Sequence, residues 1–250
     1  MQLIILGSGV GVPTSKRSAP GLCIQVKNRP VLFDSGSGTT YQLPKVGIDY
    51  HRIDHVFYTH VDHPDHINDL SEIIFANKYD YPIRKNDLNI TGPVGIRNFY
   101  ENMERLFPTL KQTPFSVNIK EVNKSQVKFN GIRVMSRPLY HQDVNCVGYR
   151  LEYGGRSIVY SGDTDYCDNI VALAKESDLL VLECSFPDEL KVNGHLTPSL
   201  AGRIANEADA KRLVLTHIYP ICDLYNILDQ ARKAYQKEII IAQDLMRVEV

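Results

Sequence analysis

Hydrophobic residues in the first half of the chain fall into short runs that alternate with stretches of helical periodicity. Compact apolar runs punctuated by Gly, Pro or Asn are typical of strands. Such runs lie at Leu3 to Leu6, Leu22 to Val26, Val31 to Phe33, His55 to Tyr58 and Leu88 to Thr91. Helical spacing of apolar residues predicts one helix over residues 67–76, and a proline opens a second over residues 93–106.

The second half of the chain repeats this alternation. Residues 147–153 and 157–160, separated by Gly154-Gly155, predict a β-hairpin. Residues 179–182 and 213–215 predict buried strands with a helix over residues 198–210 between them, and a helix (225–235) and a strand (238–242) are expected to close the chain. Because no linker or repeat separates the halves, we expect one domain over residues 1–250 in which two sheets face each other with helices outside.

Composition narrows the function classes. A chain of 250 residues with 43% hydrophobic and 23% charged residues has ordinary globular values. The net charge of −1 provides no excess of positive charge for binding a long nucleic acid or an anionic membrane. No apolar run is long enough to span a membrane. The N-terminus reads as a strand, and the five scattered cysteines form no C-x-x-C pair, so we expect a cytoplasmic protein with reduced core thiols.

A dense group of imidazole and carboxylate side chains follows the predicted strand that ends at Tyr58. The segment Thr59-His60-Val61-Asp62-His63-Pro64-Asp65-His66 contains three of the eight histidines of the chain. A strand delivers the residues after its end to one edge of a sheet, where such side chains converge. Histidine with carboxylate is a ligand set for zinc, iron or manganese. A lone histidine is more often a surface or core residue, but this cluster favours a metal site.

Three further candidate ligands also follow predicted strands. His141 comes after the run at residues 132–139, Asp163 after residues 158–160, and His217 after residues 213–215. Each alone would as readily have a structural role. Together, their positions predict a metal site at one edge of a sheet sandwich.

These motifs resemble the metallo-β-lactamase superfamily, and within it the ribonuclease Z-like branch. The resemblance covers essentially the whole chain and implies an α/β fold, the αββα four-layer sandwich. Besides the histidine cluster it rests on Gly7-Ser8-Gly9, Phe33-Asp34-Ser35-Gly36-Ser37-Gly38, Ser161-Gly162-Asp163-Thr164, Gly194-His195-Leu196-Thr197 and Leu215-Thr216-His217. A dinucleotide-binding loop at Gly7 to Gly11 is disfavoured because the full G-x-G-x-x-G spacing is lacking.

The resemblance also implies a set of metal ligands in two groups with one bridging residue. These are His60, His63 and His141 for one metal ion, Asp65, His66 and His217 for the other, and Asp163 as the bridge. Zinc is expected, with manganese and iron as alternatives.

The cluster departs from the family spacing H-x-H-x-D-H, because here it reads H-x-x-H-x-D-H. In one register His63-Pro64-Asp65-His66 keeps the usual triplet and His60 is displaced by an insertion around Val61-Asp62. In the other, His60-Val61-Asp62-His63 is the triplet and Tyr58 replaces the first histidine. We prefer the first register, because Thr59 precedes His60 as the family threonine does.

The expected chemistry is attack on a phosphodiester by a hydroxide that bridges two metal ions. Asp65 is the candidate for orienting that hydroxide. His195 suits protonation of the leaving alkoxide or stabilisation of phosphoryl charge, and the resemblance implies a catalytic histidine at this place; the alternative is a supporting or surface histidine. Asp34 is expected to orient a ligand histidine from behind.

The substrate is expected to be small. Ribonuclease Z enzymes that process transfer RNA precursors carry a long arm between the positions of His141 and Asp163, and residues 142–162 are filled here by the predicted hairpin. We therefore expect no dedicated transfer-RNA binding and favour a cyclic nucleotide or a comparable small phosphodiester. Alternatives are an RNA nuclease, a lactonase, an arylsulfatase, a non-catalytic nucleotide binder and a redox di-iron protein. The resemblance also implies a homodimer.

Overall fold

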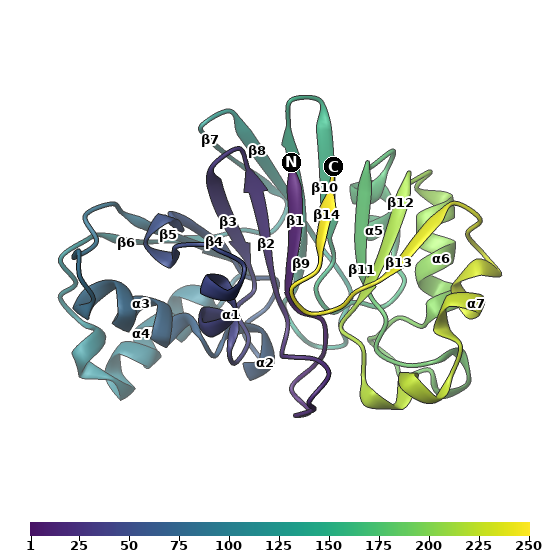
Figure 1. Ribbon diagram of the computed structural model, residues 1–250, viewed down its shortest axis with the longest axis horizontal. Helices are drawn as coiled ribbons and strands as arrows, with labels where there is room; N and C mark the ends of the chain where they lie inside the picture. Colours follow the sequence, from purple (N-terminus) through teal and green to yellow (C-terminus); the bar gives the residue numbers. More distant parts are fainter.

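The computed structural model describes all residues 1–250 and contains two seven-stranded sheets that face each other with helices on their outer faces (Figure 1). The strand order is β14-β1-β2-β3-β4-β5-β6 in one sheet and β13-β12-β11-β10-β9-β8-β7 in the other. The predicted four-layer αββα arrangement is therefore confirmed.

The first sheet combines antiparallel and parallel strands. β14, β1, β2 and β3 pair antiparallel, whereas β3, β4, β5 and β6 pair parallel and are joined through helices on the outer face. Its strands are β1 (Gln2–Gly7), β2 (Gly21–Val26), β3 (Arg29–Phe33), β4 (His55–Phe57), β5 (Leu88–Gly92), β6 (Val117–Glu121) and β14 (Arg247–Glu249). Its helices are α1 (Thr39–Lys45), η1 (Tyr50–Arg52), α2 (Pro64–Ile67), α3 (Leu70–Tyr79), α4 (Ile96–Leu106) and η2 (Pro108–Leu110).

The second sheet has the same mixed character. β7 to β10 form an antiparallel meander, and β10 to β13 run parallel. The strands are β7 (Ser125–Phe129), β8 (Ile132–Pro138), β9 (Val147–Tyr153), β10 (Arg156–Tyr160), β11 (Leu179–Glu183), β12 (Arg212–Thr216) and β13 (Glu238–Ile241). The helices are α5 (Asp168–Ala174), η3 (Asp188–Leu190), α6 (Pro198–Glu207), η4 (Pro220–Leu224) and α7 (Ile227–Arg232).

An aromatic cluster joins the inner faces of the two sheets. The rings of Phe33 and Phe57 stack with centroids 5.1 Å apart, and Tyr149 from the opposite sheet meets Phe57 edge-on at 5.3 Å. The Tyr149 hydroxyl donates to the carbonyl of Tyr58 at 2.8 Å. This contact fixes the end of β4, where the histidine cluster begins, against the second sheet.

All four predicted helices have different bounds from those expected. The helix expected over residues 198–210 ends at Glu207, and the one expected over residues 225–235 spans Ile227–Arg232. The helix over residues 67–76 is two helices, α2 and α3, separated at Asn68 and Asp69. Asp69 is turned out of the helical path because its N–H donates to the Ser35 carbonyl and its carboxylate accepts from the N–H groups of Gly38 and Thr40. The helix expected from Pro93 begins instead at Ile96, after Gly95 with φ of +111°.

The chain does not end on the strand at residues 238–242. It crosses to the first sheet, where β14 pairs with β1, and the Met1 ammonium donates to the Val250 carbonyl at 3.1 Å. Both termini therefore lie side by side at the upper edge of the sandwich in Figure 1. The short polar strands β6 and β7 and the helices α1 and α5 were not predicted, because their apolar runs are brief or interrupted.

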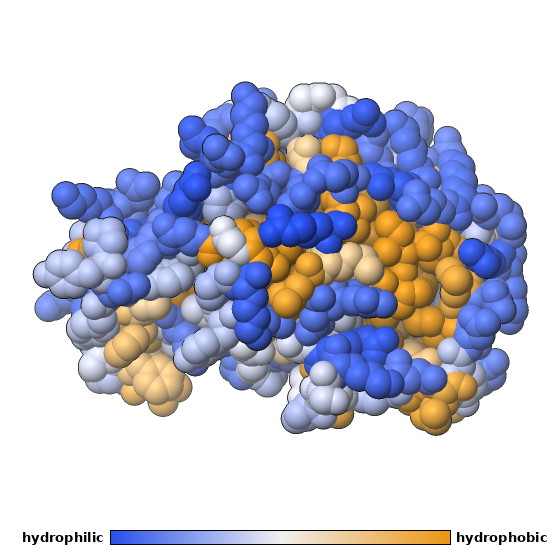
Figure 2. Space-filling view, viewed as in Figure 1, coloured by the Kyte–Doolittle hydropathy of each residue, from blue (hydrophilic) through white to orange (hydrophobic).

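The surface is mostly hydrophilic in the view of Figure 2, with hydrophobic residues visible at the right around β13 and at the lower left near α4. No helix in the structure combines the length and apolar character needed to cross a membrane. The carboxyl ends of the parallel strands in both sheets meet at the lower edge in Figure 1, and this edge is where a functional site is expected.

Replacing Phe57 with alanine should lower the free energy of unfolding by about 3–5 kcal/mol, because its fully buried ring leaves a cavity between the sheets. Urea unfolding in the presence of a metal chelator measures this loss. Tyr81 is an aromatic residue that is 83% exposed, and Tyr81→Ala should change the free energy of unfolding by less than about 0.5 kcal/mol. A Phe57→Ala protein as stable as Tyr81→Ala would contradict the assigned core.

Candidate metal centre

The predicted ligand residues converge on the lower edge of the sandwich. His60 follows β4, His63 precedes α2, and His141, Asp163 and His217 follow β8, β10 and β12. Three groups of side chains are close enough to hold a metal ion. They are His60, His63, His141 and Asp163 in the first set, Asp65, His66 and His217 in the second, and a third group, Asp163, His195 and His217, that shares Asp163 with the first set and His217 with the second.

The first set surrounds the Nδ1 atom of His63. That nitrogen lies 3.2 Å from Nε2 of His60 and 3.4 Å from Nε2 of His141, and 3.9 Å from Oδ2 of Asp163. Three ring nitrogens and one carboxylate oxygen therefore face a common point.

The second set meets the other oxygen of the same carboxylate. Oδ1 of Asp163 lies 3.1 Å from Nε2 of His66 and 3.2 Å from Nε2 of His217, and Oδ2 of Asp65 lies 3.7 Å from Nε2 of His217. Asp163 thus stands between the two sets and presents one oxygen to each.

Four of the five histidines are held with Nε2 toward the centre by a hydrogen bond at Nδ1. Nδ1 of His141 donates to the Gly194 carbonyl at 2.7 Å, and Nδ1 of His66 donates to Asp34 at 2.8 Å. In the same way Nδ1 of His60 faces Thr59 Oγ1, and Nδ1 of His217 faces Ser185 Oγ. Such bonds fix the tautomer that leaves the lone pair on Nε2 for a metal.

Burial and local charge set suitable protonation states. Burial lowers the pKa of His60 well below its ordinary value and also lowers the pKa of His141, so both rings are neutral and offer a lone pair. Burial alone would raise the pKa of Asp163, but the neighbouring imidazoles of His217 and His66 hold it well below the ordinary range. Asp163 is therefore an anionic oxygen donor.

The buried polar atoms at the centre require a partner that the chain does not supply. Nε2 of His66, Nε2 of His217 and Oδ1 of Asp163 are buried without a hydrogen-bond partner. Buried polar groups without partners are costly, and here three of them face one another. A divalent cation satisfies all three, so the donor set fits a metal ion.

Asp34 supports the centre from behind. Its fully buried carboxylate accepts hydrogen bonds from the backbone and hydroxyl of Thr59, each at 2.8 Å, from the His66 ring and from the Tyr160 hydroxyl at 2.9 Å. The backbone of Asp34 has φ of +53°, a left-handed conformation that is uncommon for residues other than glycine. Its N–H donates to the Phe57 carbonyl at 2.8 Å and holds this conformation in place.

The residues on which the two registers differ lie in different surroundings. Tyr58 is fully buried and its hydroxyl is 2.6 Å from Ser35 Oγ, whereas Asp62 is exposed and belongs to neither ligand set. The geometry therefore accommodates the register in which His60 is combined with His63, Asp65 and His66. The extra residue at Val61-Asp62 is turned outward.

Two residues without a predicted role, Glu183 and Ser185, support His195 and His217. Oε1 of Glu183 lies 2.9 Å from Nδ1 of His195, and Ser185 Oγ lies 3.2 Å from the same nitrogen and 3.0 Å from Nδ1 of His217. Burial would lower the pKa of His195, but its hydrogen bond to Glu183 raises it above the ordinary value. Glu183 is the last residue of the apolar strand β11. A carboxylate at the end of a predicted strand is the sequence signal that could have identified Glu183 as a site residue.

The two remaining histidines, His51 and His55, lie outside the centre. His51 Nδ1 pairs with Asp49 at 3.0 Å, and the His55 ring stacks on Phe129 with centroids 3.6 Å apart. Neither belongs to a group that could hold a metal.

A cleft of about 550 Å³ opens over the centre. The loop after β1 forms one wall, and its Gly11 N–H donates to Oδ2 of Asp65 at 2.8 Å. Arg17 is the only Lys or Arg that lines the cleft, and it shares Asp223 with Lys16, each at 2.9 Å. Two cations against one carboxylate leave a net positive charge at the rim, which favours an anionic substrate.

Comparison with known proteins places this site in a family. Residues 29–218 match the Beta-lactamase superfamily domain. The chain is 28% identical over 308 aligned positions to ribonuclease Z of Haloferax volcanii, an alignment that covers 100% of this chain and 95% of the relative. Because the alignment is longer than this chain, the relative contains segments that have no counterpart here.

Solved structures give the same result for the fold. The metallo-beta-lactamase fold protein YhfI from Bacillus subtilis superposes with a TM-score of 0.85 at 24% identity, covering 100% of this chain and 98% of that one. The short form of human tRNase Z superposes with a TM-score of 0.81 at 26% identity, covering 100% of this chain and 99% of that one.

Asp163→Ala should lose most of the bound divalent metal, because it removes an oxygen from both ligand sets. Elemental analysis after dialysis against metal-free buffer measures the metal content per chain. Asp62→Asn is the matched control and should keep the metal content of the parent protein. Metal loss in Asp62→Asn would favour the other register, and full retention in Asp163→Ala would contradict the bridging position.

Proposed function

This chain belongs to the beta-lactamase superfamily, and from that membership we propose that it is a metal-dependent hydrolase that cleaves a small phosphodiester, with a cyclic nucleotide as the leading candidate. The observation that carries this proposal is the position of Asp163 between two sets of candidate metal ligands. Buried nitrogen and oxygen atoms of these side chains lack a hydrogen-bond partner and face one another below an open cleft.

We assign two divalent ions to these sets, and zinc suits their mixture of imidazole and carboxylate better than magnesium or calcium does. When bound, a pair of such ions activates water and neutralises charge on phosphoryl oxygens during in-line displacement. His60, His63 and His141 would hold one ion, Asp65, His66 and His217 would hold the other, and Asp163 would contribute an oxygen to each set.

Asp65 and His195 are assigned to proton movement. Oδ2 of Asp65 is fixed by the Gly11 N–H and lies in the cleft wall, where it orients the attacking water. Nδ1 of His195 is engaged by Glu183 and Ser185, which leaves Nε2 as its free nitrogen in the cleft. Nε2 of His195 then donates a proton to the leaving alkoxide as its bond to phosphorus breaks.

Two features support a small substrate. The segment between His141 and Asp163 contains little beyond the hairpin β9–β10, so no arm extends from it to hold a folded RNA. The positive rim at Arg17 is a single local charge, whereas RNA binding usually requires many. We therefore expect no dedicated transfer-RNA binding.

A ribonuclease Z-like nuclease is the second candidate. The name of the Haloferax volcanii relative and that of the short human tRNase Z favour it, because both align with the whole of this chain. A single-stranded RNA oligonucleotide in the substrate panel distinguishes the two.

The cytoplasmic location also stays part of the proposal, since all five cysteines are free and four of them are buried.

Metal-loaded protein should hydrolyse bis(p-nitrophenyl) phosphate and cyclic nucleotides. His195→Ala should lower kcat on cyclic nucleotides by about 10²–10⁴-fold through loss of the proton donor, and should lower it far less on bis(p-nitrophenyl) phosphate, because nitrophenolate leaves without a proton. Release of nitrophenolate and chromatography of nucleotides measure the two reactions. His51→Ala, outside the site, is the control for histidine removal. Failure of fully metal-loaded protein on both substrates would refute the proposed activity.

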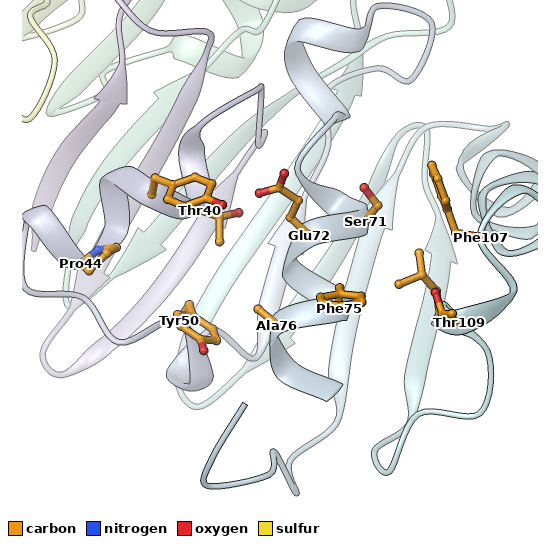
Figure 3. A pocket seen from close by; sticks show the side chains of 11 residues that line it. Thr40, Pro44, Tyr50, Ser71, Glu72, Phe75, Ala76, Phe107 and Thr109 are labelled. Carbon is orange, nitrogen blue, oxygen red and sulfur yellow. The ribbon is translucent and has the colours of Figure 1, made fainter. Parts of the chain in front are cut away.

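We also include a homodimer in the proposal. A groove of about 620 Å³ between α1, α3 and η2 is lined mainly by apolar side chains, and Figure 3 shows the rings of Tyr50, Phe75 and Phe107 along it. Phe75 is 51% exposed, and Tyr41, which also lines the groove, is 68% exposed. Clustered aromatic side chains of this kind are enriched where two proteins meet.

Phe75→Asp should convert a dimer into a monomer, because a charge in the buried interface would be left without a partner. Light scattering after size-exclusion chromatography gives the mass of the particle. Leu224→Asp, at a residue 78% exposed in η4, should keep the mass of the parent protein. A monomeric parent protein, or a dimeric Phe75→Asp variant, would contradict the assignment of this groove.

A further inference from the structure

A second pocket adjoins the metal cleft. It has a volume of about 480 Å³ and lies between the segment after β4, α3 and α4. Asn68 lines both this pocket and the cleft. A ligand whose phosphodiester lies at the metal centre can therefore extend into the second pocket past a single side chain.

The residues that make the histidine cluster irregular form a wall of this pocket. Val61 and Asp62 both line it, and a methyl group of Val61 lies beside Gly95 at the start of α4. Asp62 contributes nothing to either metal-binding set. The extra residue in the cluster thus shapes a neighbouring surface rather than the metal centre.

Three polar side chains in the pocket are uncommitted. The side chains of Asp62, Asn98 and Asn145 belong to exposed residues and make no hydrogen bond or ion pair with the rest of the chain. By contrast, Asn68 donates to Ser37 Oγ at 3.1 Å, and Oδ1 of Asn102 accepts from Arg105 at 2.9 Å. The uncommitted groups are free to bind a ligand.

The charge of the pocket excludes a phosphate. No Lys or Arg lines it, and Asp62 supplies a negative charge. The first N–H group of the α4 terminus, that of Gly95, already donates to the Glu121 carboxylate at 2.9 Å. An anionic group would face two carboxylates here, so the part of a ligand that enters must be uncharged.

The pocket also has an apolar part that includes an aromatic ring. Phe99 and Met103 of α4 line it together with Ile67 of α2. A flat, uncharged ring with polar edges matches such a surface, because its faces contact apolar groups and its edges meet carboxamides. Asn side chains bind the edges of bases through paired donors and acceptors, and a carboxylate accepts only.

We propose that this amide pocket, formed by Asp62, Asn68, Asn98, Asn102, Asn145 and Phe99, binds the nucleobase of the substrate and selects bases that carry an exocyclic amino group. Asp62 accepts a hydrogen bond from that amino group, which uracil lacks. The proposal rests on the proposed phosphodiesterase function and adds the base that the enzyme prefers.

The test compares substrates that differ only in the base. Metal-loaded protein should hydrolyse 2′,3′-cyclic AMP with kcat/KM about tenfold above that for 2′,3′-cyclic UMP, as expected for one base-specific contact. Asp62→Asn should abolish this preference, and Asn98→Ala should weaken it. Both variants should keep the parent rate on bis(p-nitrophenyl) phosphate, which has no base. Asp143→Asn, at a nearby exposed aspartate that does not line the pocket, is the matched control.

Equilibrium binding of adenosine and uridine separates this proposal from the proposed function. If no phosphodiester is cleaved but adenosine binds more tightly than uridine through Asp62, the catalytic proposal fails and the amide pocket stands. If bis(p-nitrophenyl) phosphate is cleaved but the parent protein shows no preference between the two bases in hydrolysis or binding, the amide pocket is refuted. A preference that survives in both Asp62→Asn and Asn98→Ala also refutes it.

Discussion

The buried carboxylate of Asp34 connects parts of the chain that are far apart in sequence. Taking a carboxylate out of water is costly unless hydrogen bonds replace the lost hydration, so the groups around it must hold their places. Thr59, His66 and Tyr160 donate to it from the segment after β4, from α2 and from β10 of the other sheet. Because Thr59 in turn contacts His60, and His66 faces Asp163, the arrangement of the candidate metal ligands depends on this one carboxylate.

Much of the site was predictable because ligand positions follow a simple rule of parallel sheets. His60, Asp163 and His217 each follow a strand whose apolar run is evident in the sequence, and the carboxyl ends of these strands lie at one edge. The resemblance to a known family added which residues group together. The layered architecture followed from the same runs, since two strand-rich halves with helices must cover both faces of two sheets.

The remaining features depend on contacts between distant segments. Asp69 divides a predicted helix because it binds the loop before α1, which the local periodicity does not reveal. Strand β14 forms only because β1 offers an unpaired edge at the other end of the chain. Glu183 and Ser185 gain their roles from rings contributed by later segments, and the outward turn at Asp62 becomes evident only when His60 and His63 are placed together.

The pairing of the two chain ends has a practical meaning for handling the protein. Met1 and Val250 meet at one edge of the sandwich, whereas the segments after β4, β10 and β12, which carry candidate metal ligands, lie at the opposite edge in Figure 1. A tether attached to either end therefore leaves the cleft facing away from a solid support. Because the ends are adjacent, a short peptide could join them, and new ends could be opened in an exposed turn such as Gly154-Gly155. The protein would then be attached through the second sheet rather than the first.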